Sequence, residues 1–223
     1  MEHISLDAPV VFRLGSIPVG LEVVTTWAIM AALTLAAWLG TRKRSLQPGS
    51  LQAFWEVVVS MLEAQLREVL NRDPRPHMPL IGTLFIFIAA CNLSPLIPGV
   101  RAPTASLETT AALALIVFFS AHIQGVRALG LRHYLKAYIE PNPLFLPLNV
   151  VGEISRTFSL MVRLFGNIMS HELVLGIVIS LAALLVPVPF MALGVLVGLI
   201  QAYIFSILAT VFLGAAIGAI ERG

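Results

Sequence analysis

Five stretches of this sequence are predominantly apolar, and each is long enough to cross a lipid bilayer. A helix needs about 20 consecutive apolar residues to do so. The stretches are 21–39, 80–97, 107–123, 144–186 and 189–220. Hydrophobic residues make up 58% of the 223-residue chain and charged residues only 12%, about half the charged share of a soluble domain. The excess apolar surface must face lipid, so we predict an all-α polytopic membrane protein with about five transmembrane helices.

The last two apolar stretches are longer than a bilayer is thick. At about 1.5 Å per residue, each exceeds a hydrocarbon core of roughly 30 Å. Pro187 and Pro189 separate the two stretches. Helices of this length must tilt steeply, bend or break inside the membrane.

Basic residues are distributed unevenly between the segments that flank the spans. With the N-terminus outside, Arg13 and Arg101 are the basic residues of the outer side. Those of the cytoplasmic side are then Arg42, Lys43, Arg44, Arg67, Arg72, Arg75, Arg127, Arg132, Lys136 and Arg222. Because cytoplasmic segments carry the excess of Lys and Arg, we predict a multi-pass protein with its N-terminus outside and its C-terminus in the cytoplasm.

A polar stripe marks the segment between the first two spans. Gln52, Glu56, Ser60, Glu63 and Arg67 recur every three or four residues, so on a helix they share one face. We expect an amphipathic helix without a chemical role that lies at the cytoplasmic interface or packs on the other helices.

Several classes of function are excluded by what the sequence lacks. The 14 Lys and Arg against 12 Asp and Glu leave a net charge of +2 without a long basic run, which argues against nucleic acid as a partner. The histidines are scattered and Cys91 is the single cysteine, so no metal-ligand spacing appears. A phosphate-cradling GxxxxGK loop is also missing. We therefore expect a non-catalytic protein without a cofactor.

Arg163 points most directly to a function. It lies deep in the fourth apolar stretch, and no acidic residue lies within four positions of it. A charge at membrane depth costs about 2.5–3.5 kcal/mol, and a guanidinium stays protonated even when it is desolvated. Glu172 is nine residues further on, roughly 180° around a helix and about 13 Å along it, so the two cannot pair. We prefer an anionic partner on another chain over snorkelling of Arg163 to the interface.

Other polar residues of the last two stretches gather near Arg163. Ser170 shares its helix face, and Asn167 lies close beside that face. Gln201, in the last stretch, either bonds a neighbouring helix or holds Arg163 across the hairpin.

Ionisable residues lie on both sides of Arg163. Glu153 is near the cytoplasmic start of the fourth stretch, where it pairs with Arg156 or serves an ion path. His171 and Glu172 lie toward the outer side.

The stretch 159–173, with the sequence SLMVRLFGNIMSHEL, resembles the signature of subunit a in the membrane (Fo) sector of bacterial rotary F-type ATP synthases. The resemblance continues upstream in Pro147-Leu148-Asn149 and Glu153, and downstream in Gln201-Ala202-Tyr203-Ile204-Phe205. Residues 92–99 are similar to the outer loop of that family. The resemblance covers about residue 80 to the C-terminus.

This resemblance implies an ion-conducting stator in the bacterial cytoplasmic (inner) membrane. Arg163 would face the carboxylate of each passing subunit c in the c-ring, favour its ionised form and block a direct leak of ions. Glu172 would belong to the outer half-channel and Glu153 to the cytoplasmic one, with Asn167 and Gln201 beside the arginine. The partners would be the c-ring, the peripheral-stalk subunit b and the transported proton or sodium ion. The last two helices would form a long tilted hairpin around the ring.

The chain departs from the family in one respect. Several relatives carry an ionisable group in the last helix, one or two turns before the glutamine, whereas 193–198 has none here. We expect His171 to supply that polarity from the other helix, and Gly194 and Gly198 to form a packing face of small residues.

These inferences divide a single membrane domain, 1–223, into five parts. They are the N-terminal tail with the first span, 1–47; the amphipathic helix and linker, 48–78; a helical hairpin, 79–125; a cytoplasmic loop, 126–143; and the ion-path hairpin, 144–223.

Two other functions compete with the stator. A stand-alone secondary transporter would use Arg163 as an anion site, but such folds usually contain internal repeats with paired broken helices, and none is evident. A membrane-embedded hydrolase would need paired carboxylates, yet Glu153 and Glu172 are nineteen residues apart.

Overall fold

The computed structural model describes residues 10–14, 17–41, 49–70, 73–97, 100–139, 144, 146–181 and 186–218. The elements in this part of the chain are β1 Val10–Leu14, β2 Ile17–Gly20, α1 Leu21–Thr41, α2 Ser50–Leu70, α3 Met78–Leu93, the 3-10 turns η1 Ser94–Leu96 and η2 Pro103–Ala105, α4 Leu107–Leu129, α5 Leu131–Ile139, α6 Leu146–Leu181 and α7 Pro187–Gly218. Five of these helices (α1, α3, α4, α6 and α7) are long and apolar enough to cross a membrane. The predicted all-α membrane architecture is confirmed.

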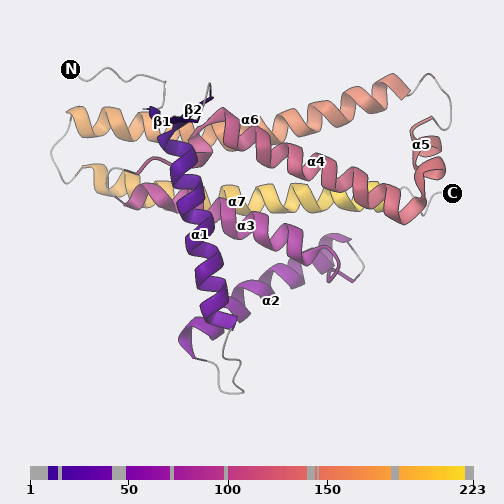
Figure 1. The fold of residues 1–223 in the computed structure, drawn as a ribbon, viewed down its shortest axis with the longest axis horizontal. Helices are drawn as coiled ribbons and strands as arrows, with labels where there is room; N and C mark the ends of the chain where they lie inside the picture. Colours follow the sequence, from indigo (N-terminus) through magenta and orange to yellow (C-terminus); the bar gives the residue numbers. More distant parts are fainter. Residues whose placement is uncertain are drawn as a thin grey trace.

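A small antiparallel pair of strands precedes the first helix. β1 and β2 pair with Leu14 opposite Ile17 and Val10 opposite Gly20, and the ladder shifts its register between Val10 and Phe12. β2 leads directly into α1 (Figure 1). The sequence analysis did not anticipate this hairpin, because each strand is only 4 or 5 residues long.

The two longest helices lie side by side and run in opposite directions. Helix α6 has 36 residues and α7 has 32, and both are unbroken. At about 1.5 Å per residue they measure roughly 54 Å and 48 Å, well beyond a hydrocarbon core of about 30 Å. In Figure 1, α1 crosses the direction of both helices steeply. Because the 20-residue span of α1 matches the bilayer when it stands upright, the hairpin must be strongly tilted, as predicted.

Helix α7 is the centre of the packing, since it contacts α2, α3, α4 and α6. Its buried positions include Gly198, Ala202, Phe205 and Ala209, spaced by three or four residues along one face. The small residues among them, Gly198, Ala202 and Ala209, allow neighbouring helix backbones to approach closely, which drives helix association where lipid removes the hydrophobic advantage. This packing fixes α7 relative to the rest of the bundle.

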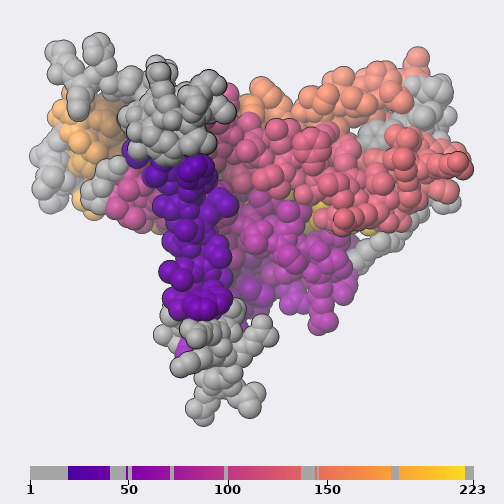
Figure 2. All heavy atoms as spheres, in the orientation of Figure 1, coloured from indigo at the N-terminus to yellow at the C-terminus, as the bar shows by residue number. Residues whose placement is uncertain are grey.

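Helix α1 lies at the outside of the bundle, as Figure 2 shows. No residue of its apolar span is buried inside the molecule. Its large side chains, among them Trp27, Leu35 and Trp38, are more than half exposed. A surface this apolar suits lipid.

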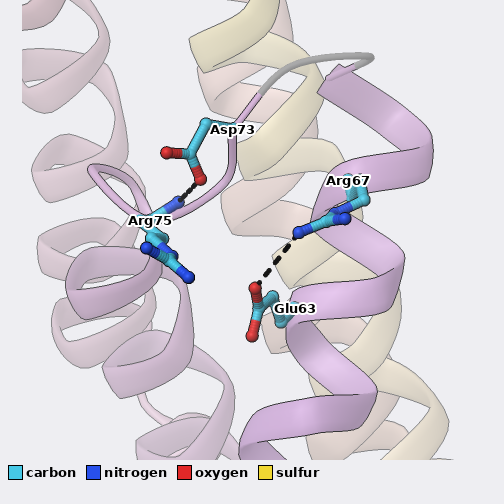
Figure 3. A network of polar contacts seen from close by, with 4 residues as sticks. All are labelled: Glu63, Arg67, Asp73 and Arg75. Carbon is cyan, nitrogen blue, oxygen red and sulfur yellow. Dashed lines mark hydrogen bonds and ion pairs between the residues drawn. The ribbon is translucent and has the colours of Figure 1, made fainter.

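Helix α2 is amphipathic, as predicted, and has three distinct faces. Leu62 and Leu66 are buried where α2 packs on α3 and α7. The polar stripe forms a second face, on which Arg67 pairs with Glu63 at 3.4 Å (Figure 3). Phe54 and other apolar side chains are exposed on a third face. The helix therefore packs on its neighbours and also presents an apolar face suited to a membrane interface.

The stretch 126–143 contains more regular structure than the loop expected from sequence. Helix α4 continues to Leu129, Gly130 adopts a φ of 77°, and α5 begins at Leu131. A positive φ is rare for residues with a Cβ, so a glycine allows the chain to turn between the two helices. Tyr134 then folds back against Gly125, where a Cβ would overlap its ring.

Candidate functional site

Arg163 lies on an exposed face of α6. Together with Ser159, Asn167 and Ser170, it forms a stripe of exposed polar residues along this helix. A different face of the helix, formed by Leu160, Leu164 and Ile168, is buried in the bundle. Polar groups on a membrane-spanning helix are costly when they face lipid. The exposed stripe therefore calls for a polar partner outside this chain.

No acidic side chain neutralises Arg163 within the part of the chain that the structure describes. Among these residues, the one ion pair within 4.0 Å joins Arg67 and Glu63 on α2, as shown in Figure 3. Glu172, nine residues away on α6, is engaged elsewhere. Arg163 and Glu172 therefore do not form an ion pair with each other.

A hydrogen bond joins the two helices of the hairpin one turn from Arg163. The Nδ2 of Asn167 donates to the Oε1 of Gln201 at 2.6 Å. Gln201 is 2% exposed, so its amide lies inside the bundle, whereas Asn167 lies on the exposed stripe. Gln201 thus bonds the neighbouring helix through Asn167 rather than through Arg163. The pair forms a polar seam next to the arginine.

Glu172 is held by the outer loop. Its Oε1 accepts a hydrogen bond from the backbone N–H of Ala102 at 2.8 Å, and the turn η2 packs on α6. Arg101 and Glu22 also act electrostatically on this carboxylate. Sequence analysis missed all three neighbours of Glu172, because a backbone donor has no residue signature and the two charged residues lie 70 or more positions away. The sequence offered one signal of this arrangement, since Glu22 is an acidic residue inside the first apolar stretch, 21–39.

His171 and Gly194 fit together across the hairpin. A Cβ placed on Gly194 would overlap the imidazole of His171. The His171 ring therefore occupies the space that a side chain at position 194 would fill. This is the region of α7 for which the sequence predicted that His171 supplies polarity from α6.

The remaining candidate residues lie in the first part of α6. Glu153 is half-buried and Arg156 is exposed. Along a helix with a rise of about 1.5 Å per residue, Glu153 lies about 15 Å before Arg163 and Glu172 about 13 Å after it. Arg163 thus stands between the two acids.

No cluster of metal-binding side chains is found in the described ranges of the chain. Cys91 is fully buried in α3 and is not part of a disulfide.

The fold and this site define a polytopic membrane protein with a fixed cation on an open face of a tilted hairpin. The family model described as "ATP synthase A chain" matches residues 23–214. A protein named "ATP synthase subunit a 2" from Bradyrhizobium sp. (strain BTAi1) is 53% identical over 223 residues, which is all of both chains. Another of that name from Pelobacter propionicus is 48% identical over 94% of this chain and 92% of its own. "ATP synthase subunit a" of Legionella pneumophila (strain Philadelphia 1) is 46% identical, with 94% and 92% covered.

The chain belongs to the ATP synthase subunit a family. The resemblance that the arginine motif indicated is confirmed, as is the expectation of a non-catalytic subunit. The protein is a multi-pass membrane subunit that serves ion transport and ATP synthesis.

Proposed function

We propose that this chain is the stator that carries protons (or sodium ions) to and from a ring of subunits c through two offset half-channels. The observation that carries the proposal is Arg163, a permanent cation on an exposed stripe of a membrane-spanning helix, without an acidic partner among the described residues. A cation in this setting is stabilised by a carboxylate brought from another subunit. Its charge favours the ionised form of that carboxylate and repels a cation that would pass directly.

The outer half-channel contains Glu172, with His171 and Ser170 beside it. Supporting this assignment, Glu172 is partly buried and turned toward the outer loop, away from the stripe of Arg163. His171 fills the space next to Gly194 on α7, so an imidazole lies between the two helices. An imidazole and a carboxylate can each take up and release a proton on such a path.

The cytoplasmic half-channel contains Glu153, near the opposite end of α6. With Arg163 between the two acids, an ion cannot move from Glu172 to Glu153 along the helix without passing the guanidinium. It must instead leave on the carboxylate of the ring and return after rotation. The Asn167–Gln201 bond keeps the two helices together at the point where the ring carboxylate meets the arginine.

The assembly follows from this role. The ring of subunits c covers the exposed stripe of α6, the peripheral-stalk subunit b holds the chain against rotation, and lipid covers α1. The chain lies in the bacterial cytoplasmic (inner) membrane with its N-terminus outside, since this orientation places most basic residues in the cytoplasm. The parts assigned from sequence, including the ion-path hairpin 144–223, belong to the same proposal.

The test uses inside-out membrane vesicles that contain the complete ATP synthase. We expect Arg163→Ala and Arg163→Lys to abolish ATP-driven ion pumping, because neither provides a delocalised permanent cation of the same reach. Arg132→Ala, which removes an exposed arginine of α5, is the matched control and should pump normally. Pumping at the normal rate by Arg163→Ala would overturn the proposal. Anion transport by the purified chain alone would favour a secondary transporter instead.

A further inference from the structure

The outer loop contains three consecutive buried residues, Ala102, Pro103 and Thr104. Ala102 and Thr104 are 0% exposed. The turn η2, which begins within this segment, contacts α1, α3, α4 and α6. Irregular backbone among membrane-spanning helices is tolerated only where the protein surrounds it and satisfies its polar groups. The segment 102–104 is thus a packed part of the bundle, and its polar groups must have assigned partners.

Two of these polar groups bond side chains of two different helices, α6 and α3. The Ala102 N–H donates to Glu172 on α6 at 2.8 Å. The Thr104 hydroxyl donates to the Oδ1 of Asn92 on α3 at 2.6 Å. The Nδ2 of Asn92 in turn donates to the carbonyl oxygen of Gly198 on α7 at 2.8 Å. One short segment is therefore connected both to the acid of α6 and, through Asn92, to the backbone of α7.

The orientation of the Asn92 amide follows from its partners. A backbone carbonyl can only accept, so the amide nitrogen must face Gly198 and the amide oxygen is left for a donor. The Thr104 hydroxyl is that donor. A Cβ at Gly198 would come within 2.9 Å of the Asn92 Cβ, so α3 and α7 are already in close contact here. The chain Thr104–Asn92–Gly198 thus fixes the rotation and height of α7 relative to α3.

Gly198 lies three residues, about one helical turn, before Gln201. Anchoring its carbonyl therefore also places Gln201, whose amide must meet Asn167 across the hairpin. We propose that the buried outer-loop segment 102–104 is a positioning element of the ion path, which orients Glu172 through the Ala102 N–H and places Gln201 through Thr104 and Asn92. Asn92 and Thr104 are positioning residues, because they act through Gln201. This inference rests on the proposed function.

The first experiment removes the Thr104 hydroxyl while keeping the shape of the side chain. In vesicles with the complete ATP synthase, Thr104→Val should lower ATP-driven pumping about fivefold or more at an unchanged amount of the chain, because it leaves the buried Asn92 Oδ1 without a donor. Thr104→Ser retains the hydroxyl and should pump close to the normal rate. Equal pumping by Thr104→Val and the unchanged protein, or equal loss in both variants, would overturn the role of the hydroxyl.

The second experiment removes the donor to Glu172. Ala102 has φ −65° and ψ 124°, and this φ is the value that a proline ring imposes. Ala102→Pro therefore suits the backbone but lacks the N–H, whereas Ala102→Gly keeps it. We expect Ala102→Pro to move the pH midpoint of passive ion flow, measured after removal of the catalytic sector, by about one unit. Ala102→Gly should leave the midpoint in place, and an unchanged midpoint in Ala102→Pro would contradict the inference.

The controls separate this inference from the function on which it rests. Loss of the chain from the membrane in both Thr104→Val and Ala102→Pro would show a role in folding alone and would overturn the positioning role. If Arg163→Ala abolishes pumping while Thr104→Val and Ala102→Pro behave normally, the stator function stands and the inference fails. If Arg163→Ala pumps normally, the stator function itself fails.

Discussion

Asn167 and Gln201 form a 2.6 Å hydrogen bond between the two longest helices, one turn from the cation Arg163. Gln201 is buried and Asn167 lies on the exposed stripe, so the bond links the interior of the bundle to the surface that Arg163 occupies. An interhelical bond of this kind is modest in energy, because the separated helices in a membrane also find polar partners. The bond matters because it joins α6 and α7 one turn from Arg163, and not because it is strong.

This bond can be measured with a double-mutant cycle. We expect Asn167→Ala and Gln201→Ala each to lower ATP-driven pumping, and the double variant to lose less than the sum of the two. The coupling should be about 0.6–1.7 kcal/mol, the range found for hydrogen bonds between membrane helices. Pumping rates and thermal denaturation of the purified complex would both give the coupling. Strict additivity would mean that the two amides act independently.

The fit between His171 and Gly194 leads to a transposition experiment. His171→Ala should lower the ion flux and change its pH dependence, because it removes the imidazole between α6 and α7. Gly194→Ala should also be impaired, since its Cβ overlaps the ring. The double variant His171→Gly with Gly194→His places an imidazole in the same space from α7 and should recover part of the flux. An unchanged flux and pH profile in His171→Ala would show that the imidazole has no role in the path.

The length of the apolar stretches was sufficient to predict the spans, because a span requires only a local count of apolar residues. Arg163 was equally accessible, since a charge inside such a stretch is conspicuous without any structure. The Ala102–Glu172 bond was not, because a backbone N–H looks the same in every residue and the two positions are 70 residues apart. The same holds for the bonds of Asn92, which lies buried in α3 within the predicted span 80–97 and contacts the distant residues Thr104 and Gly198.

Helix α5 shows a second limit of sequence analysis. The basic residues of 126–143 predicted a loop outside the spans, whereas α4 continues to Leu129 and α5 follows at Leu131–Ile139. Gly130 alone allows the turn that separates α4 from α5, and one glycine is a weak signal between two polar stretches. The partner of Tyr134, Gly125, lies on α4 and is also invisible to local patterns.

The polar stripe of α2 offers a test in which we expect no effect. The Arg67–Glu63 pair is exposed and spans one helical turn, a geometry worth about 0.3–0.5 kcal/mol at most. We therefore expect Glu63→Gln and Arg67→Gln to leave both pumping and the amount of assembled complex unchanged. Leu62→Ala is the contrasting variant, because Leu62 is buried where α2 packs on α3. A strong pumping defect in Glu63→Gln with normal assembly would give the stripe a function that the structure does not indicate.

Next to the turn between α4 and α5, the ring of Tyr134 packs directly against Gly125. A Cβ at Gly125 would overlap Tyr134 and would lie 3.3 Å from the carbonyl oxygen of Ala216 on α7, so the ring must move when Gly125→Ala is introduced. Such overpacking typically costs about 1–3 kcal/mol. Gly152→Ala is the matched control, because nothing lies within 4 Å of its added Cβ and alanine favours the helix. The midpoint of thermal denaturation of the purified complex should fall for Gly125→Ala and stay level or rise for Gly152→Ala. Adding Tyr134→Leu to Gly125→Ala should recover part of the loss, and equal midpoints for the two glycine variants would contradict the close contact at this turn.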